Sequence, residues 1–235
     1  MRPHCRRHVV MQPSSNIVKL RHLLAKRFPH LRQGPLPASS LEFFATGVPA
    51  LDALLGGGLP CGEFIELVGA GDGSGSAQVI HALLRQVSAD GRFLVLVDGS
   101  DSFDVNAVDP AVLTRLLWVR CVTTDEALKA ADLLLRDRNF PLLVIDLKLN
   151  PVTQLRKIPT STWYRLARLL EQNHTAVLVV SPFQLVGNAG CRVRIDSEFG
   201  IEAMARSPVD LLSELHFTRL YSAVGIETER ASQIG

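Results

Sequence analysis

The chain has 235 residues, 47% of them hydrophobic, and a formal net charge of +2, a composition typical of one sizeable α/β core with an appendage. Its four cysteines are scattered without Cys-x-x-Cys spacing, which argues against a disulfide or zinc framework and favours reduced thiols in a cytoplasmic protein. No apolar run is long enough to span a membrane and no secretory segment is present, so the sequence predicts no membrane partner.

Residues 1–41 form a basic arm with eight Lys/Arg and no Asp/Glu, whereas residues 42–235 carry 17 basic and 23 acidic residues. Within the arm, apolar residues recur on one helical stripe from Ser15 to about Leu31, and the basic residues that fall mostly off it are Lys19, Arg21, Lys26 and Arg27. Such a helix could pack on the core or a neighbour, lie along nucleic acid, or serve as a transit peptide; an ordinary docking helix is favoured. Residues 1–10 are an extension if the chain starts at Met11, and residues 34–40 are predicted to be a linker.

Beyond the linker, short apolar runs alternate with helical patterns, which predicts parallel strands joined by crossover helices. The candidate strands are Phe64–Val68, Phe93–Asp98, Leu116–Arg120, Leu142–Leu147 and Ala176–Val180. The candidate helices are Ser76–Ala89, Asp125–Asp137 and Ser161–Asn173, the second with Thr123 and Glu126 at capping-box spacing. Arg192–Asp196 alternates and Leu212–Leu220 also has an extended pattern. The predicted fold is therefore α/β, a mostly parallel twisted sheet flanked by helices, with an antiparallel C-terminal edge.

A glycine-rich turn follows the first of these strands, with Gly69, Gly71, Gly73 and Gly75 preceding a helix that begins at Ser76. This pattern is typical of phosphate-binding loops, whose backbone N–H groups converge on an anion and whose lysine neutralises it. In either possible alignment the lysine position holds Gly75 or Ser76, and Asp72 adds a repelling carboxylate. No lysine lies between Lys26 and Lys129, so we expect no local lysine to substitute, which leaves an arginine from elsewhere or a second subunit. An ordinary turn without a ligand is favoured.

The run Ala45–Asp52, followed by Gly57–Pro60, Gly62 and Glu66, resembles the beginning of the RecA/RadA superfamily core. The resemblance continues in order: Val97–Asp101 is similar to the family's second core strand, Leu142–Asp146 to its Walker B strand, and Leu166–Ser181 to the helix and strand that follow. It implies a RecA-like core at residues 42–225, between the basic arm and a loose tail at 226–235. Its nucleotide and magnesium positions would be Gly69, Gly71, Gly73, Gly75, Ser76 and Asp146.

Three of the family's four catalytic elements differ in this chain. The loop lysine is missing, the glutamate that polarises the attacking water is replaced by Ser100, and the glutamine that senses the γ-phosphate is replaced by Pro182. If the alignment is shifted by one residue, Asp101 takes the position of the glutamate. Gln184 lies two residues after the position of the glutamine. Because losing one such electrostatic contact costs about 10²-fold or more in rate, we expect a degenerate site: no catalytic residue, no ATP or other cofactor, no metal and no efficient ATP hydrolysis.

Two loops of this chain are similar to the family's DNA-binding loops. Residues 148–160 carry Lys148, Arg156 and Lys157, while residues 183–191 are short and uncharged. A few cations would hold a single-stranded DNA backbone weakly and in a salt-dependent way. For Arg156 and Lys157, DNA contact and a solvated loop are weighted equally.

Among RecA-like branches, the small size, the basic arm and the absence of a large C-terminal domain are most similar to ImuA-type proteins, accessory factors of translesion synthesis in the SOS response to DNA damage. The resemblance implies a non-catalytic accessory protein that binds a polymerase-like partner, with single-stranded DNA and self-association as further options. Two alternatives stay open. One is a RecA/RadA-type ATPase whose missing cation comes from a neighbouring subunit, with Ser76 and Asp146 holding magnesium, and the other is a SulA-like cell-division inhibitor.

Overall fold

The computed structural model describes residues 43–69, 71, 73–171 and 174–222. The chain divides into one unit at residues 1–41 and another at residues 42–235. The helix, linker and cations predicted for the arm lie outside the described residues, as do Asp72 and the tail at 226–235. None of the described helices is long and apolar enough to cross a membrane.

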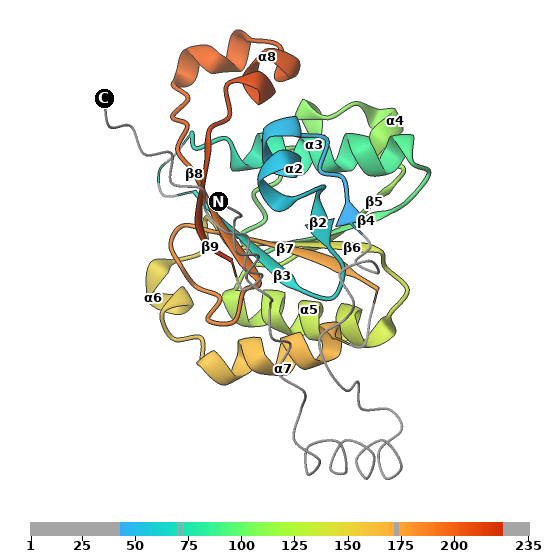
Figure 1. The fold of residues 1–235 in the computed structure, drawn as a ribbon, viewed down its shortest axis with the longest axis vertical. Helices are drawn as coiled ribbons and strands as arrows, with labels where there is room; N and C mark the ends of the chain where they lie inside the picture. Colours follow the sequence, from blue (N-terminus) through green and yellow to red (C-terminus); the bar gives the residue numbers. More distant parts are fainter. Residues whose placement is uncertain (1–42, 70, 72, 172–173, 223–235) are drawn as a thin grey trace, which may run out of the picture. The chain divides into compact units, whose positions relative to one another are not determined.

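Seven strands form one sheet in the order β5-β4-β6-β7-β3-β8-β9 (Figure 1). They are β3 (Phe64–Val68), β4 (Leu94–Asp98), β5 (Leu116–Arg120), β6 (Leu142–Asp146), β7 (Ala176–Ser181), β8 (Cys191–Ile195) and β9 (Phe217–Ser222). All neighbouring pairs are parallel except β8 and β9. A separate antiparallel pair joins β1 (Phe43–Phe44) to β2 (Leu59–Pro60). The predicted α/β class, the mostly parallel sheet and the antiparallel C-terminal edge are therefore confirmed.

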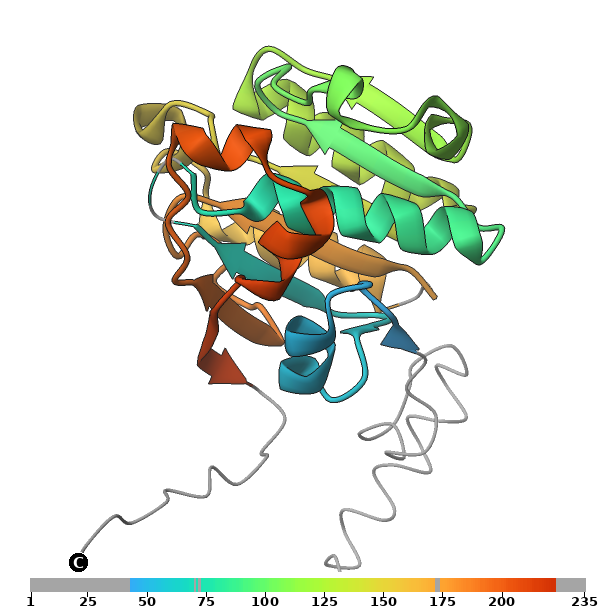
Figure 2. The same ribbon diagram turned by 90° about the horizontal axis from the view of Figure 1, so that it is seen from above.

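Helices cover both faces of this sheet, as the two ribbon views show (Figures 1 and 2). One face carries α2 (Pro49–Leu55), α3 (Ser76–Ala89) and α4 (Pro110–Leu113), and the opposite face carries α5 (Thr124–Asp137) and α7 (Thr160–Leu170). Shorter elements connect the strands: the 3-10 helices η2 (Val105–Ala107) and η3 (Ile201–Ala205), α6 (Val152–Leu155) and α8 (Pro208–Ser213).

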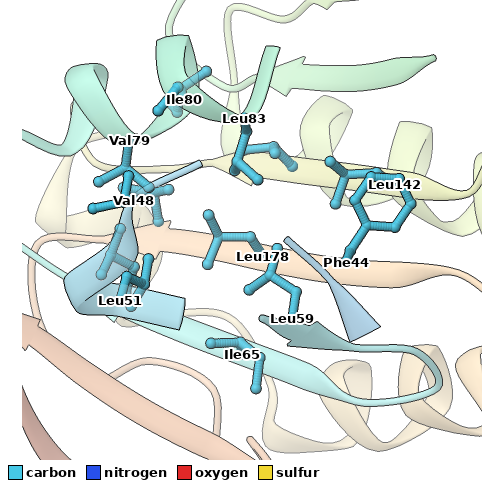
Figure 3. Packing of buried hydrophobic residues seen from close by; sticks show 14 of the residues in the cluster. Phe44, Val48, Leu51, Leu59, Ile65, Val79, Ile80, Leu83, Leu142 and Leu178 are labelled. Carbon is cyan, nitrogen blue, oxygen red and sulfur yellow. The ribbon is translucent and has the colours of Figure 1, made fainter. Parts of the chain in front are cut away.

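Two hydrophobic clusters, one on each face, explain why the central strands are apolar throughout. Successive residues of a strand point to opposite faces, so Ile65 packs in the α3 cluster and Phe64 in the α5/α7 cluster, where its ring meets Trp163 edge-on at 6.0 Å. Figure 3 shows the first cluster, in which Leu51 and Leu59 lie over β3. Burying each such leucine contributes about 1.5–3 kcal/mol. The rigid sheet that results fixes the loops at its carboxyl edge.

The helix boundaries follow local sequence signals. Thr123 is the N-cap of α5: its hydroxyl accepts a hydrogen bond from the Glu126 N–H at 3.3 Å, and the Glu126 carboxylate accepts one from the Val122 N–H at 3.0 Å. The predicted capping box is therefore confirmed, with its return bond one residue earlier than the usual pattern.

The extended pattern predicted for Leu212–Leu220 is wrong in its first part. Residues 212 and 213 belong to α8, and β9 begins only at Phe217. Pro208 occupies the first position of α8 and Asp210 lies in its first turn, both of which favour a helix start. The apolar run alone did not reveal this start.

Candidate functional site

The carboxyl ends of the parallel strands bring the predicted nucleotide positions to one edge of the sheet. The glycine-rich loop leaves β3 and leads into α3, and the Gly69 N–H donates to the Ser181 carbonyl at the end of β7 over 3.0 Å. Asp98 and Asp146 end the neighbouring strands β4 and β6 as register partners. The loop glycines, Ser76 and Asp146 thus occupy the same edge that binds ligands in open α/β sheets.

Lys148 reaches the glycine-rich loop from the end of β6. Its ammonium donates a hydrogen bond to the Gly71 carbonyl at 2.7 Å and another to the Ser74 hydroxyl. A Cβ built on Gly69 would come within 3.2 Å of the same nitrogen. The loop's own sequence contains no lysine, but the fold brings the Lys148 ammonium to it from the end of another strand. Lys148 is 77 residues from Gly71 in the chain, but the parallel strands return both residues to one edge.

The position of Lys148 also bears on its predicted role in the DNA-binding loop. Its side chain is half-buried and its ammonium is directed into the glycine-rich loop. By contrast, Arg156 and Lys157, the other two cations predicted for that role, are exposed. The structure thus separates Lys148 from the pair with which the sequence grouped it.

The segment around Phe199, between β8 and β9, packs directly on the same loop. The Phe199 N–H donates to the Gly73 carbonyl at 2.9 Å. Gly73 has φ +69°, and a Cβ there would clash with the Phe199 carbonyl oxygen; Gly75 has φ +85°, and a Cβ there would lie 3.0 Å from the Phe199 ring and clash with Leu215. Both glycines are therefore required by contacts within this chain.

Ser74 and Ser76 add two buried hydroxyls beside these glycines. They are 2% and 7% exposed, and Ser76 is the first residue of α3. The N-cap of that helix is Gly75, which makes no side-chain cap, so the first N–H groups of α3 need other partners.

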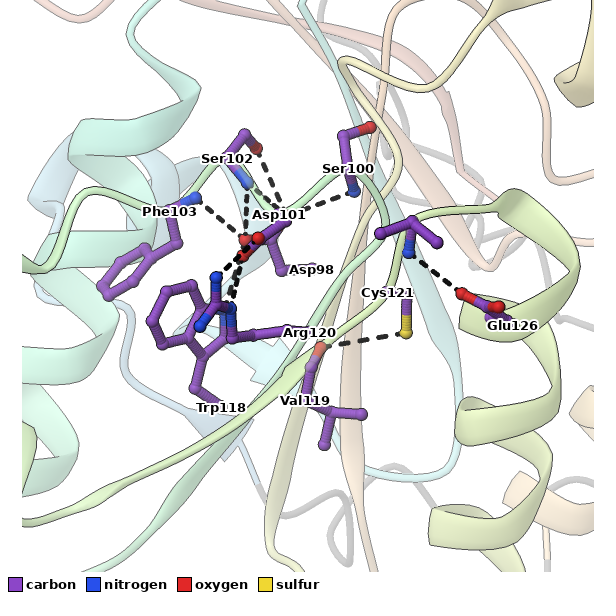
Figure 4. Close-up of polar contacts among 11 residues, drawn as sticks. Asp98, Ser100, Asp101, Ser102, Phe103, Trp118, Val119, Arg120, Cys121 and Glu126 are labelled. Carbon is purple, nitrogen blue, oxygen red and sulfur yellow. Dashed lines mark hydrogen bonds and ion pairs between the residues drawn. The ribbon is translucent and has the colours of Figure 1, made fainter.

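The Asp98 carboxylate organises the turn that follows β4 (Figure 4). It accepts hydrogen bonds from the backbone N–H groups of residues 100, 102 and 103 at 2.8–3.3 Å and from the Trp118 indole at 3.2 Å. Asp98 is 1% exposed, and these donors satisfy its charge in place of water. It therefore fixes Ser100, which stands where the resemblance expects a glutamate.

Asp101, the residue that a register slip would bring to the glutamate position, is bound to Arg120. Two hydrogen bonds of 2.6 Å join the carboxylate to the guanidinium, which also lies 4.8 Å from the centre of the Trp118 ring. The hydrogen bonds from Arg120 hold the pKa of Asp101 below its usual range. A carboxylate held in this way is a poor base, because ionisation is stabilised by its partner.

Burial raises the pKa of Asp146 to about 6. The Lys148 backbone N–H, which donates to Oδ1 at 3.0 Å, opposes this rise, whereas the nearby charge of Asp98 adds to it. Asp146 remains mostly ionised at pH 7. Among the described residues, no group of three or more His, Cys, Asp or Glu side chains is arranged to hold a metal ion.

The two loops that resemble the family's DNA-binding loops come close to each other at one contact. The Arg156 guanidinium, which follows α6, lies 5.8 Å from the centre of the Phe183 ring, which follows β7. Lys157 is exposed beside it in sequence. The Arg156 guanidinium is thus close to Phe183, the first residue of the second loop.

A buried ion pair fixes the second loop, and the sequence did not predict it. Glu66, on β3, is fully buried, and its Oε2 lies 2.5 Å from Arg192 Nε on β8. Its Oε1 accepts hydrogen bonds from the Leu185 and Val186 N–H groups at 2.6 and 3.0 Å and from the Ser181 hydroxyl at 3.0 Å. A glutamate in an otherwise apolar strand was the available signal, since a buried carboxylate needs a cation and hydrogen-bond donors.

Comparison with known proteins gives a distant similarity. No protein-family model matches the chain. Over 118 residues it is 30% identical to Protein RecA of Crocosphaera subtropica, 32% to that of Synechococcus elongatus and 30% to that of a Nostoc species. Each match covers 49% of this chain but only 33–34% of the relative, so the chain spans about a third of the length of these proteins. Half of the chain is thus distantly similar to RecA proteins, and its sheet has the architecture of a RecA-like core.

Proposed function

We propose that this chain is a RecA-like protein of DNA repair that acts without hydrolysing ATP, as a cytoplasmic accessory protein of DNA damage tolerance. In this role the core binds a polymerase-like partner of translesion synthesis, as the resemblance to ImuA-type proteins implies, and contacts single-stranded DNA. The similarity to RecA proteins supports the link to DNA repair. The narrower role rests on that resemblance and on the basic character of residues 1–41.

One observation carries the non-catalytic part of the proposal: the chain's own groups occupy the glycine-rich loop. Lys148 binds the Gly71 carbonyl and the Ser74 hydroxyl, and the Phe199 backbone binds Gly73. Contacts with Phe199 and Leu215 account for Gly73 and Gly75 without a phosphate ligand. At the position of the expected glutamate stands Ser100, whose hydroxyl is no base at neutral pH.

Complementation of a deletion strain tests this role. In the source organism, removal of the gene should lower damage-induced mutagenesis, and both the unmodified gene and Asp146→Ala should restore it. If deletion leaves mutagenesis unchanged, the accessory role is wrong. If Asp146→Ala is folded and present at normal levels yet does not restore mutagenesis, the non-catalytic assignment is wrong.

Contact with single-stranded DNA is tested separately with the exposed cations. Fluorescence anisotropy of a labelled oligothymidylate should show binding that weakens with salt, and Arg156→Gln with Lys157→Gln should lower the affinity. The control is Lys129→Gln, because Lys129 lies on the exposed side of α5 and pairs with Asp125. If the unmodified chain, the double variant and Lys129→Gln bind with equal affinity, these loop cations are excluded as DNA contacts.

Lys148 favours one alternative, a nucleotide-binding ATPase. The ammonium already lies in the loop, so it could neutralise a phosphate from β6 rather than from the loop itself. A calorimetric titration with ATP and magnesium distinguishes the two functions. Submillimolar affinity that disappears in both Lys148→Met and Asp146→Ala supports the ATPase, and the absence of heat in the unmodified chain supports the accessory protein.

A further inference from the structure

We propose that Lys148 acts as a latch: by binding Gly71 and Ser74 together, it holds the glycine-rich loop in the form on which the C-terminal segment 197–215 docks. The latch is defined here as the Lys148 ammonium with the Gly71 carbonyl and the Ser74 hydroxyl. This inference goes beyond the proposed function, because it concerns how two parts of the fold are coupled and holds whether or not the protein acts in DNA repair.

The first step is the position of the two hydrogen bonds. Gly71 and Ser74 stand on either side of Gly73, whose carbonyl accepts the bond from the Phe199 N–H. Fixing residues 71 and 74 to one ammonium therefore restricts Gly73, which lies between them. Bonds from a charged donor are stronger than neutral ones, and Ser74 is 2% exposed, so water does not easily replace the ammonium there.

The second step is that Lys148 is itself held in place. It follows β6 by two residues, next to the fully buried Leu147, and its N–H is bound by the Asp146 carboxylate at 3.0 Å. The latch therefore connects a central strand of the sheet to the loop. A lysine on an exposed loop would not transmit this restraint, because its stem would be free to move.

The third step is the dependence of segment 197–215 on the loop. The ends of this segment are joined by Ser197, whose hydroxyl donates to the Glu214 carbonyl at 3.2 Å and accepts from the His216 N–H at 2.8 Å. Between these ends the loop provides contacts at Phe199, through Gly73, and at Leu215, beside Gly75. Releasing the loop would thus remove contacts at two points of the segment.

Hydrogen–deuterium exchange of the full chain tests the latch. Lys148→Met keeps the aliphatic stem but removes the ammonium, and it should speed exchange about tenfold in peptides covering residues 69–76 and 197–215. Exchange in β7 should not change, which separates the latch from global destabilisation. Lys157→Met, a lysine of the same chain region with an exposed side chain, is the control and should change neither peptide. Unchanged protection of residues 197–215 in folded Lys148→Met would overturn the proposal.

A second pair of variants tests the coupling itself. Gly73→Ala disturbs the Phe199 contact without touching Lys148, so the effects of Lys148→Met and Gly73→Ala on residues 197–215 should be strongly less than additive in the double variant. Fully additive effects would show that Lys148 does not act through the loop. If Lys148→Met does not fold, Ser74→Ala decides: faster exchange at residues 197–215 supports the latch, and unchanged exchange refutes it.

Discussion

Lys148 and Ser74 are 74 residues apart in the chain, yet the Lys148 ammonium donates a hydrogen bond to the Ser74 hydroxyl inside the glycine-rich loop. The contact arises because the end of β6 and the end of β3 lie at the same edge of a parallel sheet. A cation therefore stands at a loop whose own sequence has none. This changes which substitutions are expected to matter.

Restoring a lysine within the loop should not create an ATPase. Gly75→Lys places a side chain at φ +85°, where a Cβ clashes with Leu215, so we expect a loss of about 1–2 kcal/mol or more in the free energy of unfolding. Ser100 would still stand at the position of the glutamate. Urea denaturation and a phosphate-release assay measure both effects, and a stable variant with ATP turnover would contradict the expectation. Gly71→Lys is a suitable control, since no atom of the described residues lies within 4 Å of a Cβ at Gly71.

Breaking the buried ion pair should strongly destabilise the core. Glu66→Ala leaves Arg192 without its carboxylate and the Leu185 and Val186 N–H groups without an acceptor, and the expected loss is about 3–5 kcal/mol. Chemical denaturation monitored by circular dichroism measures it. The exposed pair of Asp125 and Lys129 provides the comparison, because Asp125→Ala should change stability little. Similar losses for both variants would show that Glu66 is not specially stabilising.

The pKa of Asp146 predicts a pH dependence with a definite sign. Because burial raises this pKa from 3.8 to about 6, the folded state binds a proton more tightly than the unfolded state. This contribution to stability is fully present below about pH 4 and is lost as the pH rises to about 6, by up to about 3 kcal/mol. Asp146→Asn should remove this pH dependence. The free energy of unfolding of the variant should therefore rise relative to that of the unmodified protein as the pH increases from 4 to 6. Parallel stability curves for the two proteins would contradict the assignment.

Deleting residues 1–34 should weaken association with the partner or DNA while the core stays folded. The expectation follows from the eight basic residues and no acidic residues in residues 1–41. Replacing Lys19, Arg21, Lys26 and Arg27 by glutamine tests the charge without changing the length. Binding assays at two salt concentrations, with circular dichroism as the folding control, measure the effect. Unchanged binding after deletion would exclude the arm as a contact.

Much of the fold could be predicted from local patterns. Apolar runs predicted β3, β4, β6 and β7, because strands buried on both faces need no polar alternation, and they also predicted the edge strand β5. The Thr123–Glu126 spacing predicted the start of α5. The start of α8 was missed because an apolar run does not distinguish a short helix from a strand. Local sequence was sufficient for those elements whose signal, an apolar run or a capping hydrogen bond, lies within a few residues of the element itself.

The contacts of the candidate site were harder to predict, because they join distant segments. Lys148 was grouped with Arg156 and Lys157 by sequence, although its place two residues after Asp146 puts it at the edge where the loop lies. Similarly, the sequence predicts either phosphate binding or a plain turn for the glycines, but it does not predict that Gly73 and Gly75 make room for Phe199 and Leu215. Both the contact made by Lys148 and the need for glycine at positions 73 and 75 depend on tertiary packing, which no local motif encodes.

The most direct test of the proposed non-catalytic role is the rate of phosphate release by the purified full chain with ATP, magnesium and single-stranded DNA. We predict a rate no higher than that of Asp146→Ala at every DNA concentration. Turnover by the unmodified chain that Asp146→Ala abolishes would contradict the proposal and identify the protein as an ATPase.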